Sequence, residues 1–508
     1  MGAIVLSQLF GLAAKILIAR AFGTGLESEA YFAANRFSEI LFNLVAGGAL
    51  GSAFIPTLTG MLAKEDRLGA WKLISALANW VTLVLTVVGV LSAIFAPQVV
   101  HYLLAPGFTS SDPAKEALTA HLLRLQLPSA VIFGLSGLVM GSLNAHRHFL
   151  MSALAPSMYS IGLIFGAVVL VPLIGVDGLA VGVVLGALLH LLIQIPMLLR
   201  LPQHFYRLTL GLHEAATREV GRLMAPRLVG VAVVQLNFLL NTYLASFQPE
   251  GSLTGITLGF ALMMMPQAAI AQSIAIASLP TFSAQAALGK LDEMRTSLGA
   301  SLRGVLLLAL PASVGLVMLR VPVVRLVYER GEFTAQSTQI VAWALLWYAV
   351  GLVGHSVVEI VARAFYALHD TKTPVVIGIA AMSLNLGFSL VFTALFSRLG
   401  WMPHGGLALA NSLATALEMV GLLVLMRRRL SGLDGRNIWI AVGKSTIATG
   451  VLVTVVLFWM NLTQTRHAAI VVAGAVVLGG GAYVLMLVLL KVKELSLFSG
   501  LAKRLLRR

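Results

Sequence analysis

The stretch FYALHDTKTPV, residues 365–375, is a polar island between two long apolar segments. Pro374 suits the first turn of a new helix, because its missing N–H would have no helical partner there in any case. The hydroxyl of Thr373, just before it, can cap that helix. The stretch therefore predicts that one helix ends near Leu368 and another begins at Pro374, with a short hinge between them.

The helix before this hinge carries three polar residues, His355, Glu359 and Arg363, spaced four apart. Residues with this spacing share one helical face. A charge in the middle of a bilayer costs about 2.5–3.5 kcal/mol on insertion scales, so such side chains usually face a partner or a cavity. We expect Glu359 and Arg363 to pair within the protein, either in gating or only to hold helices together. Asp370 and Lys372, in the hinge, are further candidates for a structural or gating role.

The composition excludes most soluble classes of protein. Of the 508 residues, 58% are hydrophobic and only 11% are charged, whereas about 25% of residues are charged in a soluble protein. Apolar segments of about 20 residues, long enough to span a bilayer, recur along the whole chain. The sequence therefore predicts an all-helical polytopic membrane protein.

The same sequence lacks the signatures of an enzyme. It contains no cysteine, which excludes disulfides, thiolate metal sites and cysteine nucleophiles. We find no phosphate-binding glycine loop, no HExxH motif and no nucleophile with a matching base. We expect no cofactor and no metal site. The net charge of +15 is explained by basic cytoplasmic loops rather than by nucleic-acid binding.

About fourteen membrane spans are predicted, and basic residues indicate their orientation. With the N-terminus placed in the cytoplasm, most Lys and Arg residues fall in cytoplasmic loops, so both termini are expected there. The predicted spans are 2–22, 29–57, 73–103, 118–144, 149–173, 178–199, 221–247, 254–280, 297–325, 337–368, 374–397, 405–426, 436–460 and 468–490.

The chain also repeats itself at an offset of about 224 residues. The segment FIPT at 54–57 is similar to SLPT at 278–281, and APGFT at 105–109 is similar to ERGEFT at 329–334. The repeat predicts two pseudo-symmetric six-helix lobes, residues 1–200 and 201–430, followed by an appendage of two helices and a basic tail, residues 431–508. Transporters built from such repeats bind substrate between the halves, near the middle of the bilayer.

Polar residues inside the predicted spans gather on the first two helices of each half. We regard them as candidates for lining a substrate cavity. Snorkelling to the membrane surface is an alternative for Lys15 and Arg227, and a purely structural pair is an alternative for Arg36 and Glu39. The candidates are Gln8, Lys15, Arg36, Glu39, Asn43, Arg227, Gln235, Asn241 and Gln267.

Four segments of the chain resemble the MurJ family of lipid II flippases, within the multidrug/oligosaccharidyl-lipid/polysaccharide exporter superfamily. They are IARAFGTG at 18–25, APGF at 105–108, GEFT at 331–334, and the stretch 366–375. The resemblance implies a bacterial inner-membrane protein that moves the undecaprenyl-pyrophosphate-linked peptidoglycan precursor between leaflets by alternating access. It also implies a cationic central cavity and a groove for the lipid tail at the last two helices. We expect a monomer in the bilayer.

The sequence departs from this family where the cavity arginines usually lie. The segment SQLFGLAA at 7–14 stands where a Ser-Arg-x-x-Gly-x-x-Arg pattern is usual, so both arginines are missing. Phe42, Gly47 and Ala261 stand at further positions that usually carry charge. The predicted helices 7 and 11 have no carboxylate in their cores, so we expect no sodium site.

Three functions remain open at this point. The intact loop motifs favour a lipid II flippase. The missing arginines favour a divergent member that exports another polyprenyl-linked glycan or amphiphile, or a transport-inactive relative that serves as an envelope scaffold or regulator.

Overall fold

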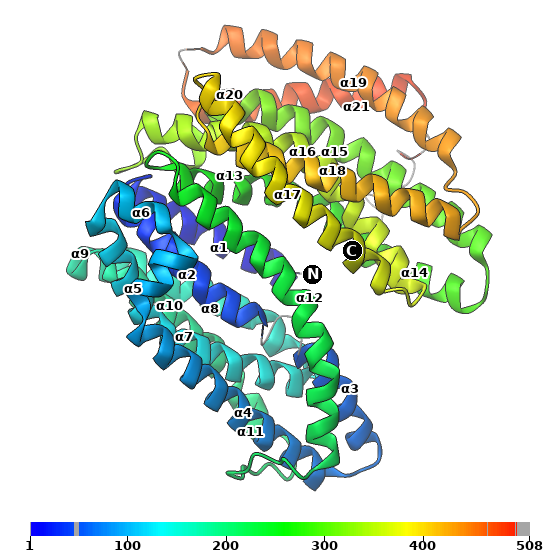
Figure 1. Cartoon of the computed structure of the whole chain (residues 1–508). Helices are drawn as coiled ribbons and strands as arrows, with labels where there is room; N and C mark the ends of the chain where they lie inside the picture. The colour runs from blue at the N-terminus through cyan, green and yellow to red at the C-terminus, as the bar shows by residue number, and fades with distance from the viewer. Residues whose placement is uncertain (1, 45–49, 465, 493, 495–508) are drawn as a thin grey trace. The chain divides into compact units, whose positions relative to one another are not determined.

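The computed structural model describes residues 2–44, 50–464, 466–492 and 494, and all of these lie in helices or in the loops that join them (Figure 1). A few helical residues, among them Arg227, are described by their backbone alone.

Eleven of the described helices are long and apolar enough to cross a membrane. They match the predicted spans except for 2–22, 29–57 and 221–247. Those three regions form α1 (Gly2–Phe22), the pair α2 (Leu26–Phe42) and α3 (Leu50–Ala63), and α12 (Ala215–Ser246). Polar residues interrupt α2 and α12, which leaves an apolar run of only Val231–Ser246 in α12. Residues 45–49 of the predicted span 29–57 lie outside the described residues, so the structure describes this span only on either side of them.

The described residues form two compact units. The first covers Met1–Thr254 together with the short segment Arg330–Thr334, and the second covers the remainder. The lobes 1–200 and 201–430 were predicted from the internal sequence repeat, whereas these units are defined by contacts within the structure. The two-lobe division therefore remains a prediction.

In the first unit the long helix α7 (Pro113–Ala145) packs against α2, α4 (Arg67–Ile94) and α10 (Asp177–Leu192). Asp112 accepts the Ala114 N–H at 2.9 Å and so caps the start of α7. α10 also packs against α8 (Phe149–Phe165), and a Cβ atom built on Gly162 would lie 2.2 Å from the Gly186 Cα. Only glycine allows the two backbones to approach this closely. The remaining helices of the unit are α5 (Ala96–Val99), α6 (Pro106–Ser111), α9 (Val171–Ile174) and α11 (Ile195–Leu199).

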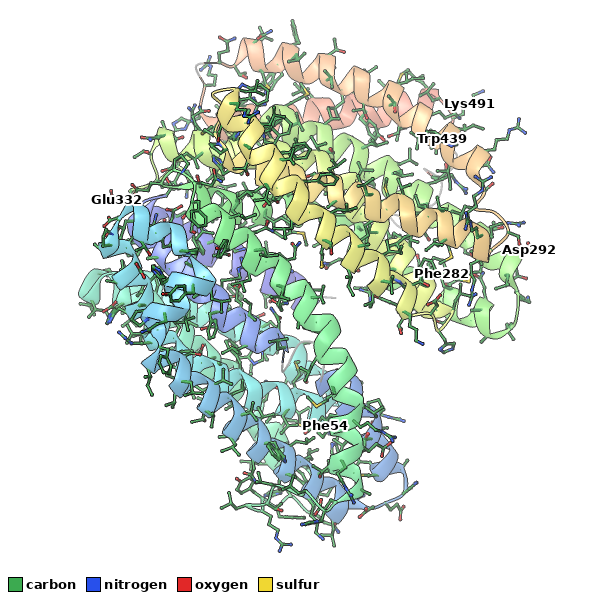
Figure 2. All side chains as sticks on the ribbon, in the orientation of Figure 1. Phe54, Phe282, Asp292, Glu332, Trp439 and Lys491 are labelled. Atoms are coloured by element: carbon green, nitrogen blue, oxygen red, sulfur yellow. The ribbon has the colours of Figure 1, made fainter. Side chains whose placement is uncertain are left out.

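In the second unit α16 (Ala335–Ala367) packs between α15 (Leu291–Tyr328) and α18 (His404–Arg429), and α17 (Lys372–Arg398) covers α18. α19 (Gly435–Leu462) packs on α15 and on α21 (Gly480–Leu489), as Figure 1 shows. The hydroxyl of Tyr483 in α21 donates to the Leu307 carbonyl at 2.5 Å. The remaining helices are α13 (Ser252–Gln267), α14 (Ser273–Ala287) and α20 (Ala468–Gly474). Each unit has its own apolar core, to which Phe54 and Phe282 belong respectively (Figure 2).

Backbone turns recur in the two halves of the sequence at nearly constant offsets. Residues with positive φ occur at Glu65 and Gly289, 224 residues apart, and at Arg147 and His369, 222 residues apart. The turns at 147 and 369 have the same hydrogen bonds. His148 N donates to Leu143 O at 2.9 Å, and Asp370 N donates to Phe365 O at 3.0 Å. Both turns therefore end a helix with a Schellman motif, in which a left-handed residue follows the last helical turn.

Candidate functional site

A cluster of charges on α2 forms the first part of the candidate site. The Arg36 guanidinium donates to Glu39 Oε2 at 2.7 Å, and Asn35 Nδ2 donates to Glu39 Oε1 at 2.9 Å. Both partners come from the same helix, because spacings of three and four residues place them on one face. Arg36 also lies over the ring of Phe238 in α12, 5.3 Å from its centroid. Glu39 is thus already occupied by local partners.

Lys15, on α1, adds a second positive charge to this cluster. It interacts electrostatically with both Glu39 and Arg36. Among the described side chains of the cluster there are therefore two cations for one carboxyl group. The Nε atom of Arg36 is buried and has no hydrogen-bond partner in the described part of the chain. An unmatched cation with a free donor suits an anionic ligand.

A small cavity of about 140 Å³ lies beside this cluster, within the first unit. Asn35 Oδ1 and Ser38 Oγ are buried there without a partner among the described residues. Apart from these two atoms, the surface that lines the cavity is almost entirely apolar. Its lining residues are Asn35, Ser38, Glu39, Phe42, Phe133, Pro156, Tyr159, Val183 and His190.

The sequence analysis missed several of these polar residues. Asn35 and Ser38 lie on the helical face that carries Glu39, so their spacing could have revealed them. His190 contacts Ser136 Oγ at 2.6 Å, and Gln194 Nε2 donates to Ser136 Oγ at 2.8 Å. His190 and Gln194 are four residues apart, but nothing in their own segment indicates that they meet Ser136 of α7.

Among the described side chains, the predicted residues Gln8, Asn43, Gln235 and Asn241 form no direct hydrogen bond with this cluster. Gln8 is exposed, and Asn43 is half-buried at the end of α2. Gln235 is buried, while Asn241 donates to Asn237 Oδ1 at 3.4 Å. The Arg227 side chain and the whole of Gly47 lie outside the described part of the structure.

In the second unit the predicted pair of α16 is present. The Arg363 guanidinium donates to Glu359 Oε1 at 2.7 Å, and both side chains are partly exposed. His355, the third residue of the predicted stripe, instead contacts Asn411 Oδ1 of α18 at 3.1 Å. The pairing is confirmed, and its gating role remains a prediction. Gln267, on α13, is buried, and its Oε1 has no partner among the described residues.

Glu418, on α18, is a charged residue that the sequence analysis did not single out. Tyr366 interacts electrostatically with Arg363, Glu359 and Glu418. Two carboxyl groups and one cation therefore interact with this tyrosine, whereas the cluster on α1 and α2 has two cations for one carboxyl group. A lone Glu in the apolar span 405–426 was the signal that could have revealed it.

The hinge at residues 368–371 differs from the prediction in one detail. α17 begins at Lys372 rather than at Pro374, and Thr373 is not its capping acceptor. Asp370 instead accepts the Thr373 N–H at 3.0 Å and the Thr373 hydroxyl at 2.8 Å. These hydrogen bonds, the backbone N–H above all, hold the pKa of Asp370 below its usual value. A carboxylate outcompetes a hydroxyl as acceptor here because its negative charge strengthens both hydrogen bonds. Lys372 is exposed.

Comparison with known proteins assigns the chain to a family. The family model "Lipid II flippase MurJ" matches residues 18–486 of the chain. This chain belongs to the MurJ family. A probable lipid II flippase MurJ of Vibrio cholerae is 28% identical over 505 residues, covering 96% of this chain and 94% of the relative. The lipid II flippase MurJ of Burkholderia cenocepacia is 30% identical over 436 residues, covering 84% and 82%.

Solved structures show the same fold. A lipid II flippase MurJ in an inward closed conformation superposes with a TM-score of 0.80 at 24% identity, covering 100% of this chain and 99% of that one. An inward-facing multidrug resistance MATE family transporter of the MOP superfamily gives 0.69 at 17% identity, covering 84% and 96%. The MurJ family consists of transporters rather than enzymes.

Three of the four MurJ-like segments, 18–25, 105–108 and 331–334, lie in the first unit, and the fourth, 366–375, lies in the second. Glu332 N donates to the Arg20 carbonyl at 2.9 Å, so the GEFT segment contacts the end of α1 (Glu332 is labelled in Figure 2). Gly23 is required at this contact: its φ is +57°, and a Cβ there would lie 2.5 Å from the Glu332 carbonyl oxygen. The APGF segment is attached to the end of α12, because Gly107 N donates to Ser246 Oγ at 3.0 Å.

A buried ion pair lies next to these MurJ-like segments. The Lys115 ammonium donates to the Glu29 carboxylate, and both side chains are less than a tenth exposed. Glu29 also accepts the Leu253 N–H at 2.8 Å, and Lys115 lies 4.2 Å from the centroid of the Phe108 ring. The pair therefore joins α2 and α7 to the start of α13, at a position that sequence spacing alone could not reveal.

Proposed function

We propose that this chain is a lipid II flippase, which moves the undecaprenyl-pyrophosphate-linked peptidoglycan precursor across the bacterial inner membrane by alternating access. The match to the MurJ family across residues 18–486 is the observation that carries this proposal. The headgroup of such a lipid is strongly anionic and cannot cross hydrocarbon unaided, so a polar, positively charged path is required.

The cluster of Lys15, Arg36 and Glu39 supplies the positive charge in this proposal. Family members usually have arginines in the first helix, where this chain has Gln8 and small or apolar residues. Lys15 and Arg36 together outnumber Glu39, and Arg36 retains an unused donor. We infer that these two cations contact the pyrophosphate, with Gln8 and Asn43 beside them. Arg227, Gln235, Asn241 and Gln267 are proposed to complete the cavity.

The architecture proposed for this function has fourteen spans with both termini in the cytoplasm. Eleven apolar helices together with α1, the α2–α3 pair and α12 supply these spans. Recurring turns at 65 and 289 and at 147 and 369 support two six-helix lobes with parallel topology. The lobes would alternate access as a monomer, with the hinge at Asp370 and Lys372 and the Glu359–Arg363 pair among the moving parts.

Complementation tests the proposal. A strain depleted of its own lipid II flippase should regain growth when it expresses this chain, and lipid II should become accessible to an external probe. A matched chain with Lys15→Gln and Arg36→Gln should reach the membrane in equal amount but restore little accessibility. Failure of the unchanged chain, despite normal membrane levels, would contradict a lipid II flippase.

A second function is favoured by one observation, the absence of the usual arginines between residues 7 and 14. A flippase for another polyprenyl-linked glycan would need a different arrangement of cations. That function would be supported if the unchanged chain failed with lipid II but moved a different polyprenyl-pyrophosphate lipid in proteoliposomes. A transport-inactive regulator would move neither lipid.

A further inference from the structure

The second unit contains a groove of about 1280 Å³ between α15, α16, α18 and the first turns of α19. It is larger than the roughly 300–1,000 Å³ of most small-molecule pockets. One part of the groove is apolar and the other is cationic. The apolar wall includes Leu302, Leu306, Leu310, Val357, Val420 and Val424.

The cationic part is the mouth of the groove, which Arg295, Arg427 and Arg436 line. Arg427 and Arg436 are exposed and have no ion-pair partner among the described residues. Arg295 contacts Asp292 at 3.0 Å but is itself one-third exposed. The mouth therefore presents two unpaired cations and one weakly paired cation.

One carboxylate, Asp434, also lines the mouth, but it is occupied. Arg303 donates to Asp434 Oδ2 at 2.6 Å, and Asn437 Nδ2 donates to Asp434 Oδ1 at 2.7 Å. Because Asp434 is turned to these partners, α19 begins without a side-chain cap. The N-terminal end of a helix attracts anions, so this end adds to the positive potential of the three arginines.

The depth of the groove matches the geometry of a membrane. Along α15 the lining runs from Arg295 to Leu310, which is about 22 Å at 1.5 Å per residue. Half of the hydrocarbon core is about 15 Å thick, so the wall can accommodate an acyl chain while the arginines stay at headgroup level. Trp439 lines the mouth and is 75% exposed, as expected of an interfacial tryptophan. Figure 2 labels it near Asp292, at the end of the unit where α15 and α19 begin.

We propose that this groove binds an anionic glycerophospholipid of the bilayer, with its phosphate at Arg427 and Arg436 and an acyl chain along the apolar wall. Basic pockets between membrane helices select anionic headgroups in this way. Charge complementarity excludes the basic end of the chain as the occupant, because residues 495–508 contain four Lys or Arg and no carboxylate. The site does not depend on the proposed flippase activity.

Lipid binding to the full-length protein in detergent tests this proposal. After delipidation, native mass spectrometry should show phosphatidylglycerol bound about tenfold more tightly than phosphatidylcholine, since each charge-assisted hydrogen bond adds affinity. Arg427→Gln with Arg436→Gln should remove most of this preference. The matched control is Arg428→Gln with Arg429→Gln, which removes two charges from the same helix end but none from the groove. Its preference should change less than about twofold.

A second measurement locates the lipid and does not depend on the arginine variants. The protein is reconstituted in nanodiscs that contain phospholipid with brominated chains. The fluorescence of Trp439 is obtained by subtracting the fluorescence of the Trp439→Phe variant from that of the unchanged protein. Brominated phosphatidylglycerol should quench this fluorescence more than brominated phosphatidylcholine does. Val420→Phe, which fills the apolar wall without adding a second tryptophan, should abolish the difference. Equal quenching by both lipids, or equal loss of binding in the two double variants, would overturn the proposal. So would displacement of the phospholipid by undecaprenyl pyrophosphate at equal concentration, which would make the groove a substrate site.

Discussion

Two helices, α2 in the first unit and α16 in the second, carry the same type of ion pair in different surroundings. Arg36–Glu39 and Arg363–Glu359 both have an N–O distance of 2.7 Å, and all four side chains are partly exposed. Lys15 interacts electrostatically with both members of the first pair, while the second pair and Glu418 both interact with Tyr366. The local excess is therefore one cation in the first unit and one carboxyl group in the second.

This difference shows that an intramembrane arginine is not by itself a sign of a substrate site. Arg363 is paired with Glu359, and the nearby Tyr366 interacts with a second carboxyl group, Glu418, so Arg363 is poorly suited to hold an anionic headgroup. Arg36 shares one carboxylate with Lys15 and keeps a donor unused. An anion therefore gains more from Arg36 than from Arg363. The predictions below test this contrast, beginning with the largest expected effect.

Neutralising the cations of the first cluster should have the largest effect on transport. Lys15→Gln with Arg36→Gln should lower lipid flux at least about tenfold, since each lost charge-assisted hydrogen bond contributes about 1.5–3 kcal/mol. Arg363→Gln, the matched change in the second unit, should lower flux by a smaller factor, because it removes no proposed contact with the anionic headgroup. Flux is measured as precursor accessibility to an external probe at equal expression. Normal flux in the Lys15 and Arg36 variants would show that both residues are structural or snorkelling.

Removing the shared carboxylate should separate stability from transport. Glu39→Gln leaves Arg36 without its charged partner, which should lower the free energy of unfolding by about 1–2 kcal/mol. It also leaves both cations free for an anionic lipid, so flux or lipid affinity should be maintained or increased. Glu418→Gln is the matched control, with no expected change in lipid affinity. A loss of lipid affinity in Glu39→Gln would mean that Glu39 itself contacts the substrate.

A double-mutant cycle should measure how strongly the pair on α16 is coupled. Because both side chains are partly exposed, Glu359→Gln and Arg363→Gln should show a coupling energy of only about 0.5–1 kcal/mol in thermal unfolding in detergent. The same cycle on Arg36 and Glu39 provides the comparison. Additive effects at Glu359 and Arg363 would rule out a stabilising pair, and a coupling above about 3 kcal/mol would indicate full burial.

The smallest effect is expected at the hinge. Asp370 caps α17, and its lowered pKa means that its stabilising contribution is present above pH 3.8, the usual aspartate value, and is lost as the pH falls through the folded-state pKa. Asp370→Asn should lower stability by about 0.5 kcal/mol at neutral pH. The melting temperatures of the variant and the unchanged protein should converge as the pH falls through the folded-state pKa of Asp370. A constant difference from pH 3 to 8 would exclude an ionised cap.

Several features follow from the sequence because they depend on local spacing. The apolar spans, the hinge near residue 370 and the pair four residues apart on α16 each lie within one segment, where periodicity fixes which side chains share a face. The sequence analysis named Thr373 as the cap of α17, whereas Asp370 is the acceptor. Both threonine and aspartate are common helix-capping residues, so residue type could not distinguish them. Only the path of the backbone after the left-handed residue His369 brings the Asp370 carboxylate to the Thr373 N–H.

The tertiary structure decides what the distant segments do together. Nothing in the local pattern of residues 18–25 or 331–334 indicates that they touch, nor that Lys115 reaches Glu29 across 86 positions. The sequence by itself determined the membrane class, the repeat and the pairs within single helices, because these depend on hydrophobicity and helical periodicity. Packing determined the excess of cations around Glu39, the excess of carboxyl groups around Tyr366 and the groove beneath Arg427 and Arg436. The charge of a site is a sum over several helices, and no single segment contains it.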